Sequence, residues 1–326
     1  MYLLLYMNIV RQSPLVNLAT LAAIIAASVV RAHLAPYEAE TFGNTATLLG
    51  SVLGSWQSNH QVAACCIAAA VWFIAGWIIG LMARMRELYF VRTTITIPIY
   101  GIAACGLFIP HDSLSAAVTS LLFAIAARSY FDAFRDGYGF SPMFFGSLPL
   151  FYAPSVVLLL LLPLAVVIFK RSAREAIVAL AGLLFAPLAA CYICWGMGRG
   201  FYAPLLQTAD ALADVSGYRF FGALPAGAAM LAGMLLALVL GAALISSANI
   251  YSMNSRARYI ILYNMCAFVI ALSTLALPSS TPAAFGLIAV PTAMTVPAML
   301  VQIRSHAATA IYGGLSLLFI LHLFID

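Results

Sequence analysis

Two glutamates in the segment "RAHLAPYEAETFGN" (31–44) have the residue type and spacing for acid–base chemistry. Pro36 disfavours helix immediately before it, and residues two apart in extended chain project to the same side, so Glu38 and Glu40 are predicted to face one site. A carboxylate placed there can take the proton of a substrate hydroxyl. The alternative is a hydrated loop, in which carboxylates are ordinary.

Two arginines bracket a second polar segment, Arg199 in "GRGFY" and Arg219 in "GYRFFG". A guanidinium binds a phosphate bidentately, and the neighbouring aromatic side chains suit the edge of a membrane. Both arginines are therefore candidate phosphate ligands. The alternative is that they anchor helix ends at the membrane interface.

Histidines and cysteines give weaker signals. His60 flanks the segment that holds the glutamates and His111 follows Pro110, and both are candidate substrate-binding residues because imidazole titrates near neutral pH. For His111 the alternative is a tight turn before a helix start at Ser113. All six cysteines fall in apolar runs, where a thiol packs as a small apolar group, so no disulfide or zinc site is predicted. No cofactor is certain, and a divalent metal at the carboxylates stays an open option.

The composition sets the class of protein that must carry these residues. Of 326 residues 64% are hydrophobic and 8% charged, far more apolar surface than a water-soluble core could hide. The sequence predicts a polytopic membrane protein with a single transmembrane domain, 1–326. The sequence lacks P-loop, HExxH, G-x-S-x-G and EF-hand motifs. The net charge of +5 is interpreted as an orientation signal, and nucleic acid is not an expected partner.

Apolar runs predict an all-α fold of about 11 transmembrane helices. The predicted spans are 16–30, 62–83, 93–109, 114–130, 139–152, 155–170, 176–197, 221–248, 258–277, 283–302 and 309–325. The fifth and sixth are short for a bilayer of ~30 Å, and a re-entrant hairpin that turns at "LPLFYAP" (148–154) is the alternative.

Charge asymmetry predicts the orientation. With the N-terminus in the cytoplasm, all but three of the fifteen basic residues fall on cytoplasmic connections, and Arg31, Arg199 and Arg219 fall outside. The outer side also receives both glutamates. It has two sizeable connections, 31–61 and 198–220, and the first includes "TATLLGSVLGSW" (45–56), which is too short to span and is predicted to lie in the interface as a helix.

This arrangement resembles the integral-membrane GT-C superfamily of glycosyltransferases, which take sugars from polyprenyl-phosphate carriers at the outer side of the membrane. The shared features are the cytoplasmic N-terminus, the acidic first outer loop with its interfacial helix, and the stretch 139–195, which is similar to the middle of those enzymes. Much of the chain is also similar to an uncharacterised family of bacterial polytopic inner-membrane proteins. The resemblance implies a bacterial inner (cytoplasmic) membrane location.

The GT-C resemblance also implies roles for residues. An acidic residue of the first outer loop acts as the base or as a metal ligand, which by position falls on Glu38 or Glu40, although Ala39 separates them where the family has an adjacent acidic pair. Basic groups of later outer loops bind phosphate, which falls on Arg199 or Arg219. The expected partners are membrane lipids and a polyprenyl-phosphate-linked substrate.

Two other functions fit the same sequence. A lipid-carrier transporter or flippase is favoured by prolines inside predicted spans, which permit kinks and moving half-helices. A non-catalytic membrane subunit of an envelope assembly is favoured by small-residue runs such as 222–244, which suit packing against a membrane protein partner.

Overall fold

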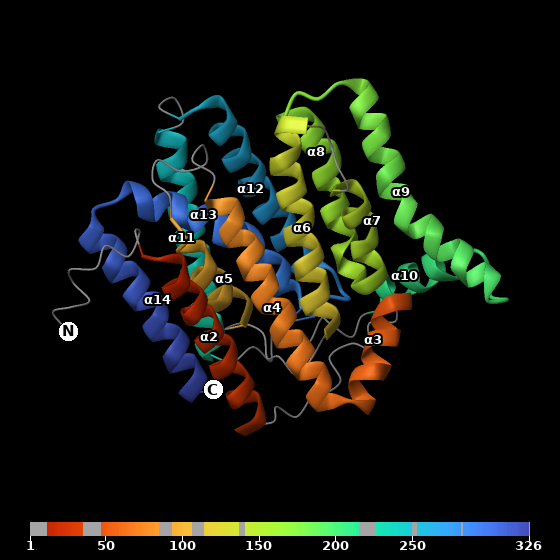
Figure 1. Cartoon of the computed structure of the whole chain (residues 1–326), viewed down its shortest axis with the longest axis horizontal. Coiled ribbons are helices and arrows are strands. Elements are labelled where there is room, and N and C mark those ends of the chain that lie inside the picture. The colour runs from red at the N-terminus through yellow and green to blue at the C-terminus, as the bar shows by residue number, and fades with distance from the viewer. Residues whose placement is uncertain are drawn as a thin grey trace.

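The computed structural model describes residues 12–34, 47–84, 93–105, 114–136, 141–214, 226–249, 253–281 and 283–325. Within these ranges the chain is helical and contains no strand, which confirms the predicted all-α class (Figure 1). The helices are α2 (Pro14–Leu34), α3 (Leu48–Asn59), α4 (Gln61–Ala83), α5 (Thr96–Cys105), α6 (Leu114–Asp136), α7 (Ser141–Phe151), η3 (Ala153–Leu160), α8 (Leu161–Ile168), α9 (Ala173–Gly196), α10 (Ala203–Ala213), α11 (Ala226–Ala248), α12 (Ser255–Ser273), η6 (Thr274–Ala276), α13 (Ala284–Gln302) and α14 (Ser305–Ile325).

Seven of the described helices are long and apolar enough to cross a membrane: α2, α4, α9, α11, α12, α13 and α14. About 20 residues at 1.5 Å per residue cover a hydrocarbon core of ~30 Å. Their length and composition make the chain a multi-pass membrane protein, as the apolar runs predicted. The other predicted spans correspond to the shorter apolar helices α5 and α7, to the apolar part of α6, and to the η3–α8 pair.

The pair formed by α7 and η3–α8 turns where the sequence predicted a turn. Ser141, at the start of α7, donates a hydrogen bond to the Ala126 carbonyl oxygen in the middle of α6. At the end of α7, Thr47 and Ser115, from the starts of α3 and α6, both donate to the Phe151 carbonyl oxygen. At 1.5 Å per residue the 11 residues of α7 cover about 16 Å, which is half of a bilayer core. The chain then breaks helix at Tyr152, inside 148–154.

Helix α13 is the centre of the bundle. Every residue from 284 to 300 is buried, and the helix packs against α4, α5, α6, α11 and α12. Polar groups tie three of these elements together: Tyr100 of α5 lies 2.8 Å from the Ser120 hydroxyl of α6, and Ser120 donates to the Gly286 carbonyl oxygen of α13 at 2.8 Å. Because Ser120 has one hydroxyl proton, Tyr100 is the donor in the first of these hydrogen bonds.

The two ends of the bundle differ in charge. The connections that carry Lys170, Arg171 and Arg304 lie toward the upper end in Figure 1, and α3 and α10 lie at the lower end. Helix α2 runs from the upper toward the lower end, so that Arg31, in its last turn, belongs to the lower end. By the positive-inside rule the upper end is the predicted cytoplasmic end and the lower end is the predicted outer side.

Capping residues define the start of α9 on the basic end. Ser172 is the N-cap and accepts a hydrogen bond from the Glu175 amide at 3.3 Å. Lys170 has φ 51°, the left-handed conformation that closes the end of the preceding helix, and the Arg171 amide donates to the Val166 carbonyl oxygen at 2.9 Å. The turn from α8 to α9 is therefore built from hydrogen bonds of its own backbone and cap.

Candidate lipid-binding slot

Four of the predicted site residues, Glu38, Glu40, His111 and Arg219, lie outside the described residues. Their roles stay predictions. The other two, His60 and Arg199, are described, and both are exposed.

His60 joins α3 to α4 and is held by local contacts. Its amide donates to the Trp56 carbonyl oxygen at 3.0 Å, and its ring centroid lies 5.6 Å from that of Trp56. The predicted helix in the first outer connection is confirmed as α3, and it ends on this pair. An aromatic pair at the end of a short outer helix is typical of the membrane interface.

Arg199 lies in the turn between α9 and α10. Its amide donates to the Cys194 carbonyl oxygen at 2.9 Å, next to a cluster of three aromatic rings, Tyr192, Phe201 and Tyr202. Helix α10 packs against both α9 and α3, so the described parts of the two outer connections adjoin. The proximity of these two segments is consistent with a shared site. The exposure of the Arg199 side chain instead favours the alternative role, in which it anchors a helix end at the membrane interface.

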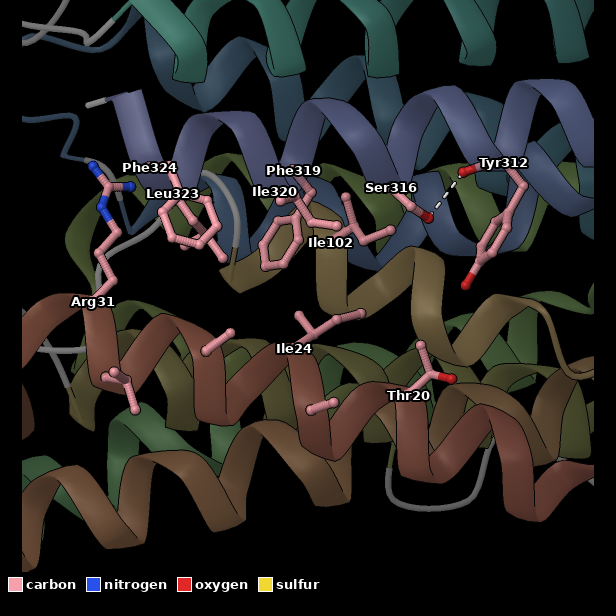
Figure 2. A pocket seen from close by; sticks show the side chains of 13 residues that line it. Thr20, Ile24, Arg31, Ile102, Tyr312, Ser316, Phe319, Ile320, Leu323 and Phe324 are labelled. Carbon is pink, nitrogen blue, oxygen red and sulfur yellow. Dashed lines mark hydrogen bonds between the residues drawn. The ribbon is translucent and has the colours of Figure 1, made fainter. Parts of the chain in front are cut away.

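A cavity of about 810 Å³ lies between α2 and α14, with α5 as its floor, and we call it the slot (Figure 2). Its volume falls within the ~300–1,000 Å³ typical of ligand sites. It is lined by Thr20, Ala23, Ile24, Ala27, Val30, Arg31, Ile102, Tyr312, Ser316, Phe319, Ile320, Leu323 and Phe324.

The slot is elongated along helices α2 and α14. Thr20 and Tyr312 lie at one end, and Arg31 lies beside Leu323 and Phe324 at the other (Figure 2). The eleven residue steps from Thr20 to Arg31 correspond to about 16 Å of helix, roughly half of a hydrocarbon core. The slot is therefore as long as the tail region of one bilayer leaflet and has its charged end at the predicted outer side.

Exposed apolar side chains on the slot's walls show that it opens sideways. Val30, Ile320 and Phe324 line it and are 56%, 48% and 85% exposed. Helix α2 packs mainly against α4 and α5, whereas α14 packs mainly against α11, so the two walls belong to different parts of the bundle. In a membrane these exposed walls face acyl chains, and a lipid can enter the slot without crossing water.

Two hydroxyl groups in the inner part of the slot are hydrogen-bonded within their own helices, and the Tyr312 hydroxyl adds a third polar group there. Thr20 donates to the Val16 carbonyl oxygen and Ser316 to the Tyr312 carbonyl oxygen, each at 2.9 Å. A hydroxyl that donates to its own helix offers an apolar methyl or methylene surface to a neighbour. The inner part of the slot is thus suited to hydrocarbon.

The outer end of the slot holds a contact between two basic side chains. Arg31 Nη1 lies 3.1 Å from His322 Nε2, and His322 is only 5% exposed while Arg31 is half-buried. His322 lies in the last turn of α14, and its side chain is buried and contacts Arg31. Arg31 retains further N–H donors for a ligand, since a guanidinium has five and this contact uses one.

Sequence reasoning counted Arg31 as an orientation signal and did not place it in a site. Two features of the sequence could have indicated a site here. Arg31 is an arginine on the predicted outer side, against the usual bias, and His322 is an ionisable residue within the last predicted span. What the sequence lacked was the pairing of the first span with the last. Among the described residues no group of three His, Cys, Asp or Glu side chains is placed to hold a metal ion.

Comparisons with known proteins returned no match: no protein-family model, no curated protein and no solved structure resembles the chain. The slot must therefore be interpreted from its chemistry. An apolar channel one leaflet long, open to the bilayer and ending at a guanidinium, is suited to an amphiphile with a hydrocarbon tail and an anionic head.

Proposed function

We propose that this chain is a GT-C-like membrane glycosyltransferase that moves a sugar from a polyprenyl-phosphate donor to an acceptor at the outer side of the membrane. The observation that supports it is Arg31 at the outer end of the slot. The isoprenoid tail lies in the slot, and Arg31 binds the phosphate through charge-assisted hydrogen bonds.

In the proposed reaction an acceptor hydroxyl attacks the anomeric carbon of the sugar. The bond from that carbon to the phosphate oxygen breaks, its electron pair stays on the phosphate, and Glu38 or Glu40 takes the acceptor's proton. Arg31 stabilises the negative charge that develops on the leaving phosphate.

Chain connectivity keeps the proposed base near the proposed phosphate site. Helix α2 continues three residues beyond Arg31 to Leu34, and four further residues lead to Glu38. Even at full extension this places the Cα atoms of Glu38 and Arg31 within about 19 Å of each other. Arg199 and Arg219 stay predicted as phosphate ligands of the second outer connection.

The binding step is tested with farnesyl phosphate and farnesol, two probes that share one tail and differ only in the phosphate. The full-length protein is held in phosphatidylcholine nanodiscs, and retention of each radiolabelled probe is measured. Arg31→Gln is expected to weaken farnesyl phosphate binding about tenfold or more while leaving farnesol unchanged, because a hydrogen bond to a charged group is lost. Equal loss of both probes, or of neither, contradicts the assignment.

Two alanine variants serve as a matched pair for the tail. Ala27 lines the slot, whereas Ala22, on the same helix, is exposed and outside the lining. Ala27→Phe fills the channel and is expected to weaken both probes, and Ala22→Phe is expected to change neither. An equal effect of the two substitutions means that the probes bind elsewhere.

The reaction itself is tested by sugar transfer in membranes with Glu38 and Glu40 both replaced by glutamine. Loss of transfer with farnesyl phosphate binding intact supports the base. Retained transfer in the folded variant rejects it. Tail binding without any transfer, together with movement of the carrier between leaflets, favours the transporter, for which Pro291 and Pro297 in the central helix α13 supply kink positions.

A further inference from the structure

The slot has two fixed ends, and the two helices that form its walls give the same distance between them. Arg31 lies at the outer end, and Thr20 and Tyr312 lie at the inner end (Figure 2). On α2 the eleven residue steps from Thr20 to Arg31 cover about 16 Å. On α14, His322 lies beside Arg31, with 3.1 Å between Nε2 and Nη1, and the ten steps back to Tyr312 cover about 15 Å.

The Tyr312 ring supplies most of the bulk at the inner end. It points from α14 into the space between α14 and α2 (Figure 2), and it packs against the hydrophobic core. The facing wall on α2 consists of small side chains there, Thr20, Ala23 and Ala27. Among the described residues the lining begins at Thr20 on α2 and at Tyr312 on α14. The tyrosine is therefore the large side chain that a tail entering from the outer end meets last.

This distance can be compared with the length of prenyl chains. An extended carbon chain advances about 1.3 Å per bond, so the three isoprene units of a farnesyl chain span about 15 Å. A geranyl chain, with two units, spans about 10 Å, and a geranylgeranyl chain, with four, about 20 Å. A tail whose phosphate is held by Arg31 thus meets Tyr312 after three units.

We propose that Tyr312 is a specificity-determining residue that limits the slot to the first three isoprene units after the phosphate, and that the rest of a longer tail leaves sideways into the bilayer. This inference rests on the proposed function and defines which part of the tail its site recognises. The side of the slot is open where Ala23 and Ile320 line it and are exposed.

The physical basis is a difference in packing. An isoprene unit inside the slot gains close contacts with fixed walls. A unit that leaves the slot stays among acyl chains, which are as apolar as the protein, and gains nothing. Affinity should therefore rise with tail length until the slot is full and then stay constant, and we call the shortest tail that reaches the constant value the plateau length.

The test measures retention of radiolabelled geranyl, farnesyl and geranylgeranyl phosphate by the full-length protein in phosphatidylcholine nanodiscs. The wild-type protein is expected to bind farnesyl phosphate roughly threefold more tightly than geranyl phosphate and to bind geranylgeranyl phosphate no more tightly than farnesyl phosphate. An affinity that still rises at the fourth unit, or that is the same for all three probes, overturns the inference.

Substitutions at the inner end are expected to move the plateau length in opposite directions. Tyr312→Ala opens the inner end and is expected to move it to geranylgeranyl. Ala23→Phe places a ring three residues, or about 4.5 Å, closer to Arg31 than Thr20 is, and is expected to move it to geranyl. Tyr312→Phe keeps the ring and is expected to keep the plateau at farnesyl. The matched control is Tyr192→Ala, because Tyr192 is 61% exposed on α9 and lies outside the lining.

The outcomes separate this inference from the proposed function. A plateau that stays at farnesyl in both Tyr312→Ala and Ala23→Phe overturns the role of Tyr312, as does an equal shift in Tyr192→Ala. If Tyr312→Ala does not fold, Ala23→Phe decides whether the inner end sets the length. A plateau that moves as expected without any sugar transfer refutes only the enzyme proposal, whereas sugar transfer with an immovable plateau refutes only this inference.

Discussion

A close approach between helices α7 and α9 offers a sharp test of the packing. Gly146 of α7 faces Leu183 of α9, and a Cβ atom at position 146 would lie 2.0 Å from the Leu183 carbonyl oxygen, 2.9 Å from its carbonyl carbon and 3.3 Å from its Cα. All three neighbours are backbone atoms, so no rotation of a side chain relieves the overlap. Gly146→Ala must push the helices apart by about 1 Å to reach even the shortest tolerable contact.

That displacement is expected to lower the free energy of unfolding by about 3 kcal/mol, the upper end of the cost of overpacking, because the backbone has to move. The two helices are also close at Gly182, one residue before Leu183, where an added Cβ atom would lie 3.1 Å from the Pro142 Cβ of α7, so the same shift also loosens the packing there. For a chain of this size the loss corresponds to a fall in Tm of roughly 5 °C.

The assay is thermal unfolding in detergent followed by tryptophan fluorescence or by aggregation. The matched control is Gly233→Ala in α11, where a Cβ would meet nothing within 4 Å, and its expected effect is neutral or slightly stabilising because alanine is the better helix former. Gly182→Ala, whose Cβ atom would lie 3.1 Å from the Pro142 Cβ and 3.8 Å from the Met143 backbone nitrogen, is expected to fall between the two. Wild-type stability in Gly146→Ala would show that α7 and α9 do not approach in this way.

Three further substitutions test local features of the fold by the same unfolding assay. Lys170→Gly is expected to be about 1 kcal/mol more stable than Lys170→Ala, because the backbone angle φ 51° is strained for any residue with a Cβ atom. Both variants lose the lysine side chain, so the comparison isolates the backbone. Equal stabilities would contradict the left-handed turn. Ser172→Ala removes the N-cap of α9 and is expected to cost about 1 kcal/mol, with Ser172→Asp restoring most of it. Tyr100→Phe removes the hydrogen bond to Ser120 and is expected to cost about 1 kcal/mol, and no change would mean that this bond adds nothing to the core.

The sequence predicted the helices well, because an apolar run long enough to span a bilayer is a local property. Predicted spans such as 283–302 and 16–30 agree with α13 and α2 to within a few residues at each end. The turn near 148–154 was predictable from its two prolines, and α3 from its length and amphiphilic composition. These features need no knowledge of tertiary contacts.

The sequence could not tell which helix lies at the centre. Lipid tails and a protein core are both apolar, so hydropathy does not separate a helix that faces lipid from one that faces protein. Helices α9 and α13 are both apolar enough to cross a membrane, yet α9 is mostly exposed and α13 is enclosed. What distinguishes them is the set of neighbours, which is a property of the whole bundle.

The slot was hidden for a related reason. Arg31 and His322 are 291 positions apart, and each looks like an ordinary residue near the end of a span. Only the side-by-side placement of the first and last long helices joins them. The candidate carboxylates Glu38 and Glu40 came from residue type and spacing, and those predictions await the binding and transfer experiments.

The central position of α13 has a consequence for biogenesis. Helices α4, α5 and α6 are synthesised long before residue 284. Their contacts with α13 can therefore form only after α13 has been made. At ~5–20 residues per second the delay between the synthesis of these helices and that of α13 is on the order of 10 to 40 s. During that interval lipid or an insertion factor must cover the faces of α4, α5 and α6 that later contact α13, so substitutions on these faces should affect the yield of the protein more than its final stability.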